Sequence, residues 1–318
     1  MKIVMLERNS LGVDIDVSRF ADFGPFEEYP VSVLNDTAEK VKDAEVIIVN
    51  KVPMDQRTLS EASNLKLICE TATGTDNIDL EYCRSRGITV TNVKGYSTDT
   101  VAQHTFALLF YVMEKLRWYD DYVKSGEYSN QPRFSNFDQT FFEMKGRTWG
   151  IIGLGEIGRS VASIATAFGM NVIYYSASGR SYDVPYKCVD FDTLLKNSDI
   201  VSIHAPLNEY TRNLMNYEAF CKMKPSAYLI NVGRGPIIND EDLARALNEN
   251  KIAGAGLDVL GVEPMDKNNP LGRIQDSRKL IITPHMAWAS VEARERLVNE
   301  VYENLKAYCA DEERSHVR

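Results

Sequence analysis

Short, continuously apolar stretches alternate with amphipathic stretches along the whole chain. In the first hundred residues the apolar stretches predict strands at 2–7, 45–50, 65–70 and 88–93, and helical or turn segments separate them at 36–41 and 54–64. Strands that alternate with helices indicate βαβ units and a parallel sheet.

The second half of the chain repeats this pattern more strongly. It predicts strands at 148–153, 171–176, 199–205, 227–233, 254–260 and 280–283. Most are apolar throughout, which is typical of parallel strands that are buried on both faces. We therefore expect a second, larger α/β domain.

The boundary between the two domains is expected near residues 97–100, before a long helix that should reach about Lys124. A final helix, about residues 290–309, carries Leu297, Val301 and Leu305 on one face. The local pattern does not decide on which domain this helix packs.

Composition narrows the class of protein. The 318 residues, 44% hydrophobic and 25% charged, fit a globular chain of two domains. A net charge of −9 argues against a nucleic-acid partner or an anionic membrane. Five cysteines without a CxxC spacing fit reduced thiols better than a disulfide or metal framework. No apolar run is long enough to span a membrane and no signal peptide is evident, so we expect a cytoplasmic protein.

The sharpest local motif is a glycine-rich turn at residues 150–158, between a predicted strand and a predicted helix. Gly153 allows a tight turn, Gly155 lets the backbone approach a pyrophosphate, and Gly158 lets helix and strand pack closely. Glu156 and Ile157 begin the helix, whose N-terminus favours an anion. The motif predicts a dinucleotide site.

The strand after this motif lacks the acidic residue that usually holds the ribose hydroxyls of NAD. Ser176, Ser178 and Arg180 stand there instead. Hydroxyl groups and a guanidinium suit a 2′-phosphate, which favours NADP(H) over NAD(H). The alternative is that serine binds the ribose of NAD directly and Arg180 is solvated.

Polar residues follow several predicted strands, at the sheet edge that carries the glycine-rich turn. Arg234 follows strand 227–233, Glu263 follows strand 254–260, and His285 follows strand 280–283. Ligands of open α/β sheets bind at this edge. Each residue alone could be an ordinary loop residue, but together with a dinucleotide site they indicate an active site.

These motifs resemble the D-isomer-specific 2-hydroxyacid dehydrogenases, in particular hydroxypyruvate and glyoxylate reductases. The resemblance covers essentially the whole chain and rests on residues 153–158, 231–235, 256–264 and 283–285, with residues 73–79 similar to the family's substrate-carboxylate loop. It implies two Rossmann-like domains with doubly wound parallel sheets and an active-site cleft between them. Residues 1–98 and 289–318 would form a flavodoxin-like substrate domain, and residues 99–288 the dinucleotide domain.

The resemblance also implies the chemistry. Hydride would pass between the nicotinamide and C2 of a small 2-oxo or 2-hydroxy acid such as hydroxypyruvate or glyoxylate. His285 would donate or accept the proton, Glu263 would orient the imidazole, and Arg234 would bind the substrate carboxylate and polarise the carbonyl.

Further contacts come from the same resemblance. Backbone N–H groups of Thr73 and Gly74 would bind the substrate carboxylate. Lys51 is a candidate for the same site, with a solvated surface lysine as the alternative. The cofactor would contact Val232, Gly233 and Asp258 on its nicotinamide side, and His204, Ala205 and Pro206 on its adenine side. The family is typically dimeric, and the aromatic-rich residues 128–142 are a candidate interface.

Three other functions stay open. A formate dehydrogenase would pair its histidine with glutamine, which Glu263 argues against. Phosphoglycerate dehydrogenase-type activity is disfavoured by the short segment after Trp288, and a dinucleotide-sensing corepressor by the lack of long flanks. His104 and His316 lie outside any motif and are expected to be structural or solvent-exposed.

Overall fold

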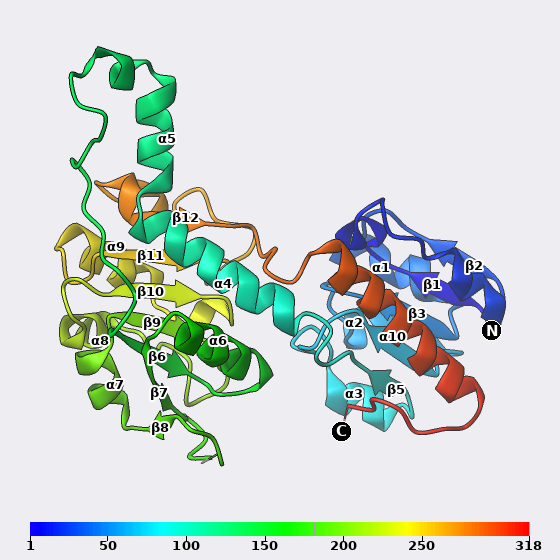
Figure 1. Cartoon of the computed structure of the whole chain (residues 1–318). Coiled ribbons are helices and arrows are strands. Elements are labelled where there is room, and N and C mark those ends of the chain that lie inside the picture. The colour runs from blue at the N-terminus through cyan, green and yellow to red at the C-terminus, as the bar shows by residue number, and fades with distance from the viewer. Residues whose placement is uncertain (181, 318) are drawn as a thin grey trace. The chain divides into compact units, whose positions relative to one another are not determined.

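Two bodies of secondary structure make up the chain, seen in the computed structural model that describes residues 1–180 and 182–317 (Figure 1). Met1–Ser97 and Ala289–Arg318 form one unit, which we call the split unit. Thr98–Trp288 form the other, the continuous unit. The sequence predicts the first break after residue 98, one residue later than in the structure, and the second break at the same place, after residue 288.

The continuous unit is built on a seven-stranded sheet in the order β12-β11-β10-β9-β6-β7-β8. Every neighbouring pair is parallel. The strands are β6 (Thr148–Ile152), β7 (Asn171–Tyr175), β8 (Lys187–Cys188), β9 (Ile200–Ile203), β10 (Tyr228–Asn231), β11 (Gly254–Leu257) and β12 (Leu280–Ile282). The order reverses between β6 and β9, which is the topological switch point of a Rossmann sheet.

Helices cover both faces of this sheet. The helices are α4 (Thr98–Met113), α6 (Glu156–Ala167), α7 (Phe191–Asn197), α8 (Tyr217–Lys222) and α9 (Asp240–Asn248). Ile151 of β6 packs in one apolar core with α4 and α6, and Ile152 packs in the other with α7, α8 and α9. Adjacent residues of one strand thus serve two cores, which explains why the strands are apolar throughout.

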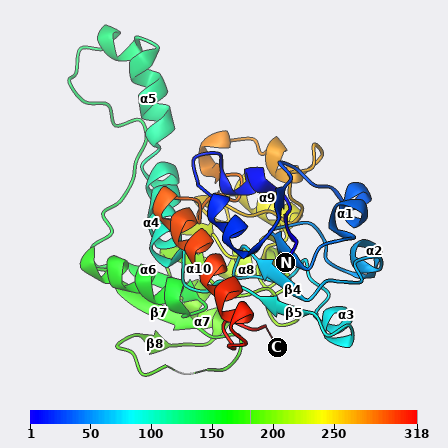
Figure 2. The same ribbon diagram turned by 90° about the vertical axis from the view of Figure 1, so that its right-hand side faces the viewer.

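The prediction of a single helix that reaches Lys124 is wrong, because the structure has two helices there. Lys115 adopts a left-handed conformation with φ 56°, which ends α4 and lets α5 (Leu116–Lys124) start in a new direction. No residue of α5 is buried. Figures 1 and 2 show α5 and the loop after it projecting from the rest of the continuous unit.

The split unit contains a five-stranded parallel sheet in the order β2-β1-β3-β4-β5. The strands are β1 (Ile3–Met5), β2 (Phe26–Glu28), β3 (Val46–Val49), β4 (Leu67–Glu70) and β5 (Thr89–Thr91). The order reverses between β1 and β3, as in a flavodoxin-like sheet. The pattern of apolar residues missed β2 and β8, which lie at sheet edges and contain no buried residue.

The helices of the split unit are α1 (Leu34–Val41), α2 (Gln56–Leu59), α3 (Leu80–Ser85) and α10 (Val291–Cys309). Val41, Leu59 and Cys83 of the first three pack in one core with alternate strand residues. α10 contacts β4, and Asn304 donates a hydrogen bond of 3.2 Å to the carbonyl of Asn92. The last helix therefore belongs to the split unit.

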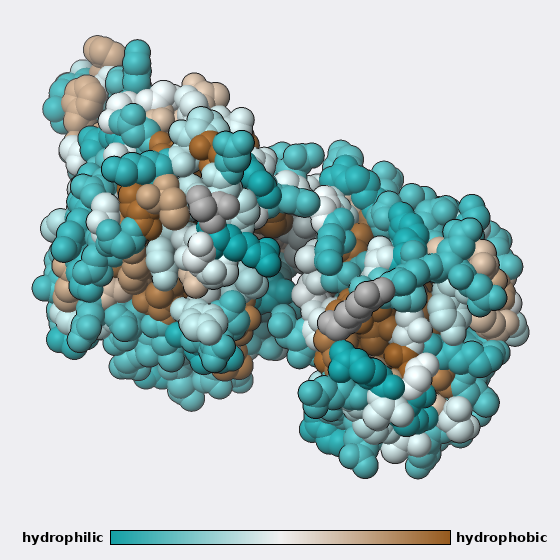
Figure 3. All heavy atoms as spheres, turned by 90° about the horizontal axis from the view of Figure 1, so that it is seen from below, coloured by the Kyte–Doolittle hydropathy of each residue, from teal (hydrophilic) through white to brown (hydrophobic). Residues whose placement is uncertain are grey.

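Short 3-10 helices complete the described chain: η1 (Arg8–Leu11), η2 (Ser18–Phe23), η3 (Glu127–Asn130), η4 (Gly235–Ile237), η5 (Pro270–Arg273) and η6 (Ser277–Lys279). Hydrophilic residues cover much of the surface shown in Figure 3. Among the described residues, no helix has the length and apolar character needed to cross a bilayer.

Candidate active site

The glycine-rich turn links β6 to α6. Gly153 has φ 92°, and a Cβ there would lie 2.7 Å from the backbone nitrogen of Ala205. A Cβ at Gly158 would lie 2.3 Å from the carbonyl oxygen of Gly153. A Cβ at Gly155 would meet nothing within 4 Å, so the fold itself does not need this glycine. The open space at Gly155, at the start of α6, suits a phosphate that approaches the backbone closely.

The turn after β7 gathers the polar residues expected to recognise the adenosine ribose. The Oγ atoms of Ser176 and Ser178 lie 3.3 Å apart, and Gly179, with φ 70°, turns the chain so that its N–H donates to the Ser176 carbonyl. Ser178 and Arg180 are exposed. Two hydroxyl groups thus form a small polar cluster at the end of the strand.

The loop after β9 contains His204, Ala205 and Pro206. The His204 Nε2 atom lies 2.9 Å from the Ser202 Oγ, which also accepts a hydrogen bond of 2.8 Å from the Trp149 indole. Burial of the ring lowers the pKa of His204 to about 3. The imidazole is therefore uncharged at neutral pH and offers no positive charge to a phosphate.

His285 and Glu263 form a close pair. The His285 Nδ1 atom lies 2.6 Å from Glu263 Oε2, and Glu263 Oε1 accepts a hydrogen bond of 2.9 Å from the Leu260 N–H. The two side chains are 25% and 34% exposed, so a small ligand can reach them. With Nδ1 engaged, Nε2 is the nitrogen left to face a substrate.

Buried Asn231 shapes the turn that carries Arg234. Its side-chain amide donates to the Arg234 carbonyl and its oxygen accepts from the Gly233 N–H, each at 3.0 Å. A Cβ at Gly235 would lie 1.8 Å from the Leu260 carbonyl oxygen. The turn after β10 therefore packs directly against the loop that leads to Glu263, which brings two of the three predicted catalytic segments together.

Asp258, directly after β11, contacts the loop that carries His285. It is 1% exposed, and its Oδ1 accepts from the Thr283 hydroxyl at 2.6 Å and the Met286 N–H at 2.9 Å. Its Oδ2 accepts from the Ala287 N–H at 2.8 Å. The carboxylate thus holds the loop that carries His285.

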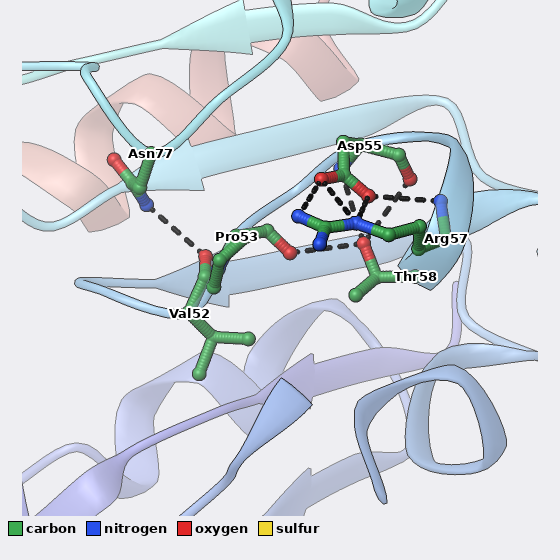
Figure 4. Close-up of polar contacts among 6 residues, drawn as sticks. All are labelled: Val52, Pro53, Asp55, Arg57, Thr58 and Asn77. Carbon is green, nitrogen blue, oxygen red and sulfur yellow. Dashed lines mark hydrogen bonds and ion pairs between the residues drawn. The ribbon is translucent and has the colours of Figure 1, made fainter. Parts of the chain in front are cut away.

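In the split unit, the segment with Lys51 is joined to the predicted carboxylate loop. The Met54 N–H donates to the Asn77 carbonyl at 2.8 Å, and the Asp79 N–H donates to the Met54 carbonyl at 2.9 Å. The Asn77 side chain donates to the Val52 carbonyl at 3.3 Å (Figure 4). Lys51 is exposed beside this junction.

Both segments are anchored at the sheet edge. Glu7, two residues after β1, accepts hydrogen bonds through Oε2 from the N–H groups of Asn50, Lys51 and Val52, at 3.3, 2.8 and 3.0 Å. Thr73 donates through its hydroxyl to the Val93 carbonyl at 2.7 Å. The Lys51 segment therefore lies at the β1/β3 switch point, where ligands of such sheets bind.

Sequence reasoning missed Glu70, the last residue of β4. It is fully buried, accepts a hydrogen bond of 3.0 Å from the Asn77 side chain, and has no partner for Oε1 among the described residues. Burial raises the pKa of its carboxyl well above the ordinary value. An acidic residue that ends an apolar strand was the only signal. Within the described chain, no group of three or more His, Cys, Asp or Glu side chains could hold a metal.

A dinucleotide turn at the switch point and a carboxylate-paired imidazole at the same sheet edge define a nicotinamide-dependent oxidoreductase. A family model described as "D-isomer specific 2-hydroxyacid dehydrogenase, NAD binding domain" matches residues 106–287. The chain is 37% identical over 310 residues to a glycerate dehydrogenase of Methylorubrum extorquens, covering 97% of this chain and 96% of that one.

Solved structures of nicotinamide-dependent enzymes are similar to this chain over almost its whole length. An acyclic imino acid reductase in complex with NADPH and D-Arg superposes with a TM-score of 0.89 at 31% identity, over the full length of both chains. A D-lactate dehydrogenase from Aquifex aeolicus, complexed with NAD and lactic acid, gives a TM-score of 0.83 at 30% identity and covers 97% of this chain and 96% of that chain. The chain belongs to the D-isomer specific 2-hydroxyacid dehydrogenase family and is an NAD(P)-dependent oxidoreductase.

Proposed function

We propose that this enzyme reduces a small, unphosphorylated 2-oxo acid of the hydroxypyruvate or glyoxylate type, and that the reaction is reversible. The observation that carries the proposal is the His285–Glu263 pair, 2.6 Å apart, at the sheet edge that also bears the dinucleotide turn. The glycerate dehydrogenase relative supports this substrate class.

Each catalytic side chain has one task in this proposal. Protonated His285 gives its Nε2 proton to the carbonyl oxygen as negative charge develops there. Glu263 holds the ring through Nδ1, so that Nε2 faces the substrate. Arg234 binds the substrate carboxylate and polarises the carbonyl. In the reverse direction, neutral His285 accepts the proton of the hydroxyl group.

The split unit supplies the remaining substrate contacts. Backbone N–H groups of Thr73 and Gly74 bind the carboxylate, and Lys51 adds a positive charge. The hydrogen bonds between the Lys51 segment and residues 77–79 support this pairing of the two segments.

The cofactor supplies or accepts hydride at its nicotinamide ring when bound. The residues that would hold it are Gly153, Gly155, Glu156, Ile157, Gly158, Ser176, Ser178, Arg180, His204, Ala205, Pro206, Val232, Gly233 and Asp258. We propose a preference for NADP(H) over NAD(H), because Ser176, Ser178 and Arg180 replace the usual acidic residue and can bind a 2′-phosphate.

The experiment that tests the proposal is an assay of glyoxylate, hydroxypyruvate, pyruvate, phenylpyruvate and phosphohydroxypyruvate with NADH and with NADPH. We expect turnover of an unphosphorylated acid, a loss of kcat of about 10²- to 10⁴-fold in His285→Ala with cofactor affinity nearly unchanged, and a larger loss of NADPH than NADH affinity in Arg180→Ala.

Three outcomes contradict parts of the proposal. Turnover of the phosphorylated acid alone would favour a phosphoglycerate dehydrogenase-type activity. Cofactor binding without turnover of any acid would favour a dinucleotide-sensing protein. Equal losses of NADH and NADPH affinity in Arg180→Ala would remove the 2′-phosphate assignment.

We also propose that the enzyme is a cytoplasmic homodimer. All five cysteines are unpaired, which fits a reducing compartment. The segment after α5 exposes Phe134, Phe137 and Phe141 to 91, 72 and 58%. An exposed group of large apolar side chains indicates a surface that another chain covers.

A further inference from the structure

His104, on helix α4, lies against the loop that carries the catalytic histidine. Its Nε2 atom is 3.0 Å from the Thr283 Oγ1 and 3.6 Å from the Asp258 Oδ1. The His104 side chain is 17% exposed and the Asp258 side chain 1%. No motif in the sequence drew attention to His104, and the mechanism proposed above does not use it.

The direction of each hydrogen bond follows from the single proton on the Thr283 hydroxyl. That hydroxyl lies 2.6 Å from the Asp258 carboxylate but 3.5 Å from the Leu257 carbonyl. It therefore donates to Asp258, which can only accept when ionised. The Thr283 oxygen is then left to accept from His104, so His104 must carry its proton on Nε2.

The same carboxylate fixes the backbone that directly follows His285. It accepts hydrogen bonds from the N–H groups of Met286 and Ala287. The His285 N–H donates a hydrogen bond of 2.9 Å to the Asp258 carbonyl. His285 has φ 53°, in the left-handed region. A non-glycine residue stays in this region only when its surroundings hold it there.

We propose that His104 is a positioning residue, which acts through Thr283 and Asp258 to hold residues 283–287 so that His285 faces Glu263 and the substrate. This inference rests on the proposed role of His285. His104 touches neither substrate nor cofactor in this assignment. Its N–H orients the Thr283 hydroxyl, the hydroxyl orients the carboxylate, and the carboxylate sets the backbone around the catalytic imidazole.

The chain of contacts from His104 through Thr283 to Asp258 is called the relay below. Two pairs of matched variants test it. Thr283→Val removes the hydroxyl at nearly constant shape, and Thr283→Ser keeps it. His104→Leu removes the donor, and His104→Gln places an amide N–H near the Nε2 position. We expect kcat to fall about 10- to 100-fold in Thr283→Val and in His104→Leu, since small misplacements of a catalytic group cost this much. The Kd for NAD(P)H, from quenching of tryptophan fluorescence, should stay within about twofold.

The conservative variants and a double variant distinguish a positioning role from a loss of stability. Thr283→Ser and His104→Gln should recover most of kcat. The double variant Thr283→Val/His104→Leu should be no slower than the slower single variant, because both changes break one chain of contacts. Wild-type kcat in either breaking variant, equal losses in Thr283→Ser and Thr283→Val, or multiplicative losses in the double variant would each overturn the inference.

A measurement without turnover keeps the inference separate from the proposed function. Nitrogen-15 NMR of the four histidines should show the His104 proton on Nε2, and this signal should change in Thr283→Val. A proton on Nδ1 overturns the relay whether or not the enzyme turns over. Absence of wild-type turnover with the Nε2 proton in place overturns the proposed function and leaves the relay intact.

Discussion

At the scale of single residues, Glu70 is an ionisable group whose charged form is disfavoured by its surroundings. It is fully buried at the end of β4, with the Asn77 amide as a partner for one oxygen. Burial raises the pKa of its carboxyl because the charged form loses its hydration. The folded protein therefore binds a proton here at pH values where the unfolded chain has released it.

We expect Glu70→Gln to stabilise the protein at pH 8 by about 1–2 kcal/mol, because glutamine needs no proton to stay neutral. The stability that protonated Glu70 contributes is fully present below its ordinary pKa of 4.5 and is lost as the pH rises through the raised value. The gain from the variant should therefore shrink toward pH 4, measured by urea unfolding. The exposed Glu61→Gln is the control, and an identical pH dependence in wild type and Glu70→Gln would refute the assignment.

Residues that follow apolar strands were the ones that the sequence could identify. Arg234, Glu263 and His285 each stand at the end of a predicted strand, and the rule for parallel sheets predicts that they share an edge. Glu70 and His104 could not be identified this way. The significance of Glu70 comes from burial, and that of His104 from a hydrogen bond to a residue 179 positions away.

At the scale of elements, the three glycines of the β6–α6 turn have separate tasks. We expect Gly155→Ala to leave the melting temperature nearly unchanged and to weaken NAD(P)H binding about tenfold or more, because the new Cβ meets no protein atom but occupies the phosphate approach.

Gly158→Ala is the matched variant, since its Cβ would meet the Gly153 carbonyl at 2.3 Å. It should lower the melting temperature by several degrees, as overpacking costs about 1–3 kcal/mol. Calorimetry and fluorescence titration of both variants check these outcomes. A large loss of stability in Gly155→Ala would mean that this glycine serves the fold.

Apolar runs located the central strands well, because parallel strands buried on both faces leave little room for polar residues. The edge strand β2 has the sequence Phe-Glu-Glu and is largely exposed, so its pattern resembles a loop. The break between α4 and α5 was also missed. Lys115 is a good helix former, and only its left-handed backbone, with φ 56°, ends the helix.

At the scale of the whole molecule, the exposed phenylalanines after α5 predict the oligomeric state. We expect the wild-type protein to sediment as a dimer and the triple variant Phe134→Ser/Phe137→Ser/Phe141→Ser to sediment as a folded monomer. Circular dichroism should show unchanged secondary structure. A wild-type monomer, or a variant that remains dimeric, would exclude this surface as the interface.

The split unit also has a consequence for synthesis on the ribosome. Its strands emerge first, but α10, which contacts β4, emerges only after the roughly 190 residues of the continuous unit. At about 5–20 residues per second, this delay is on the order of 10–40 s. During that time one face of the nascent sheet lacks its helix, so the growing chain exposes apolar surface to chaperones until α10 has been synthesised.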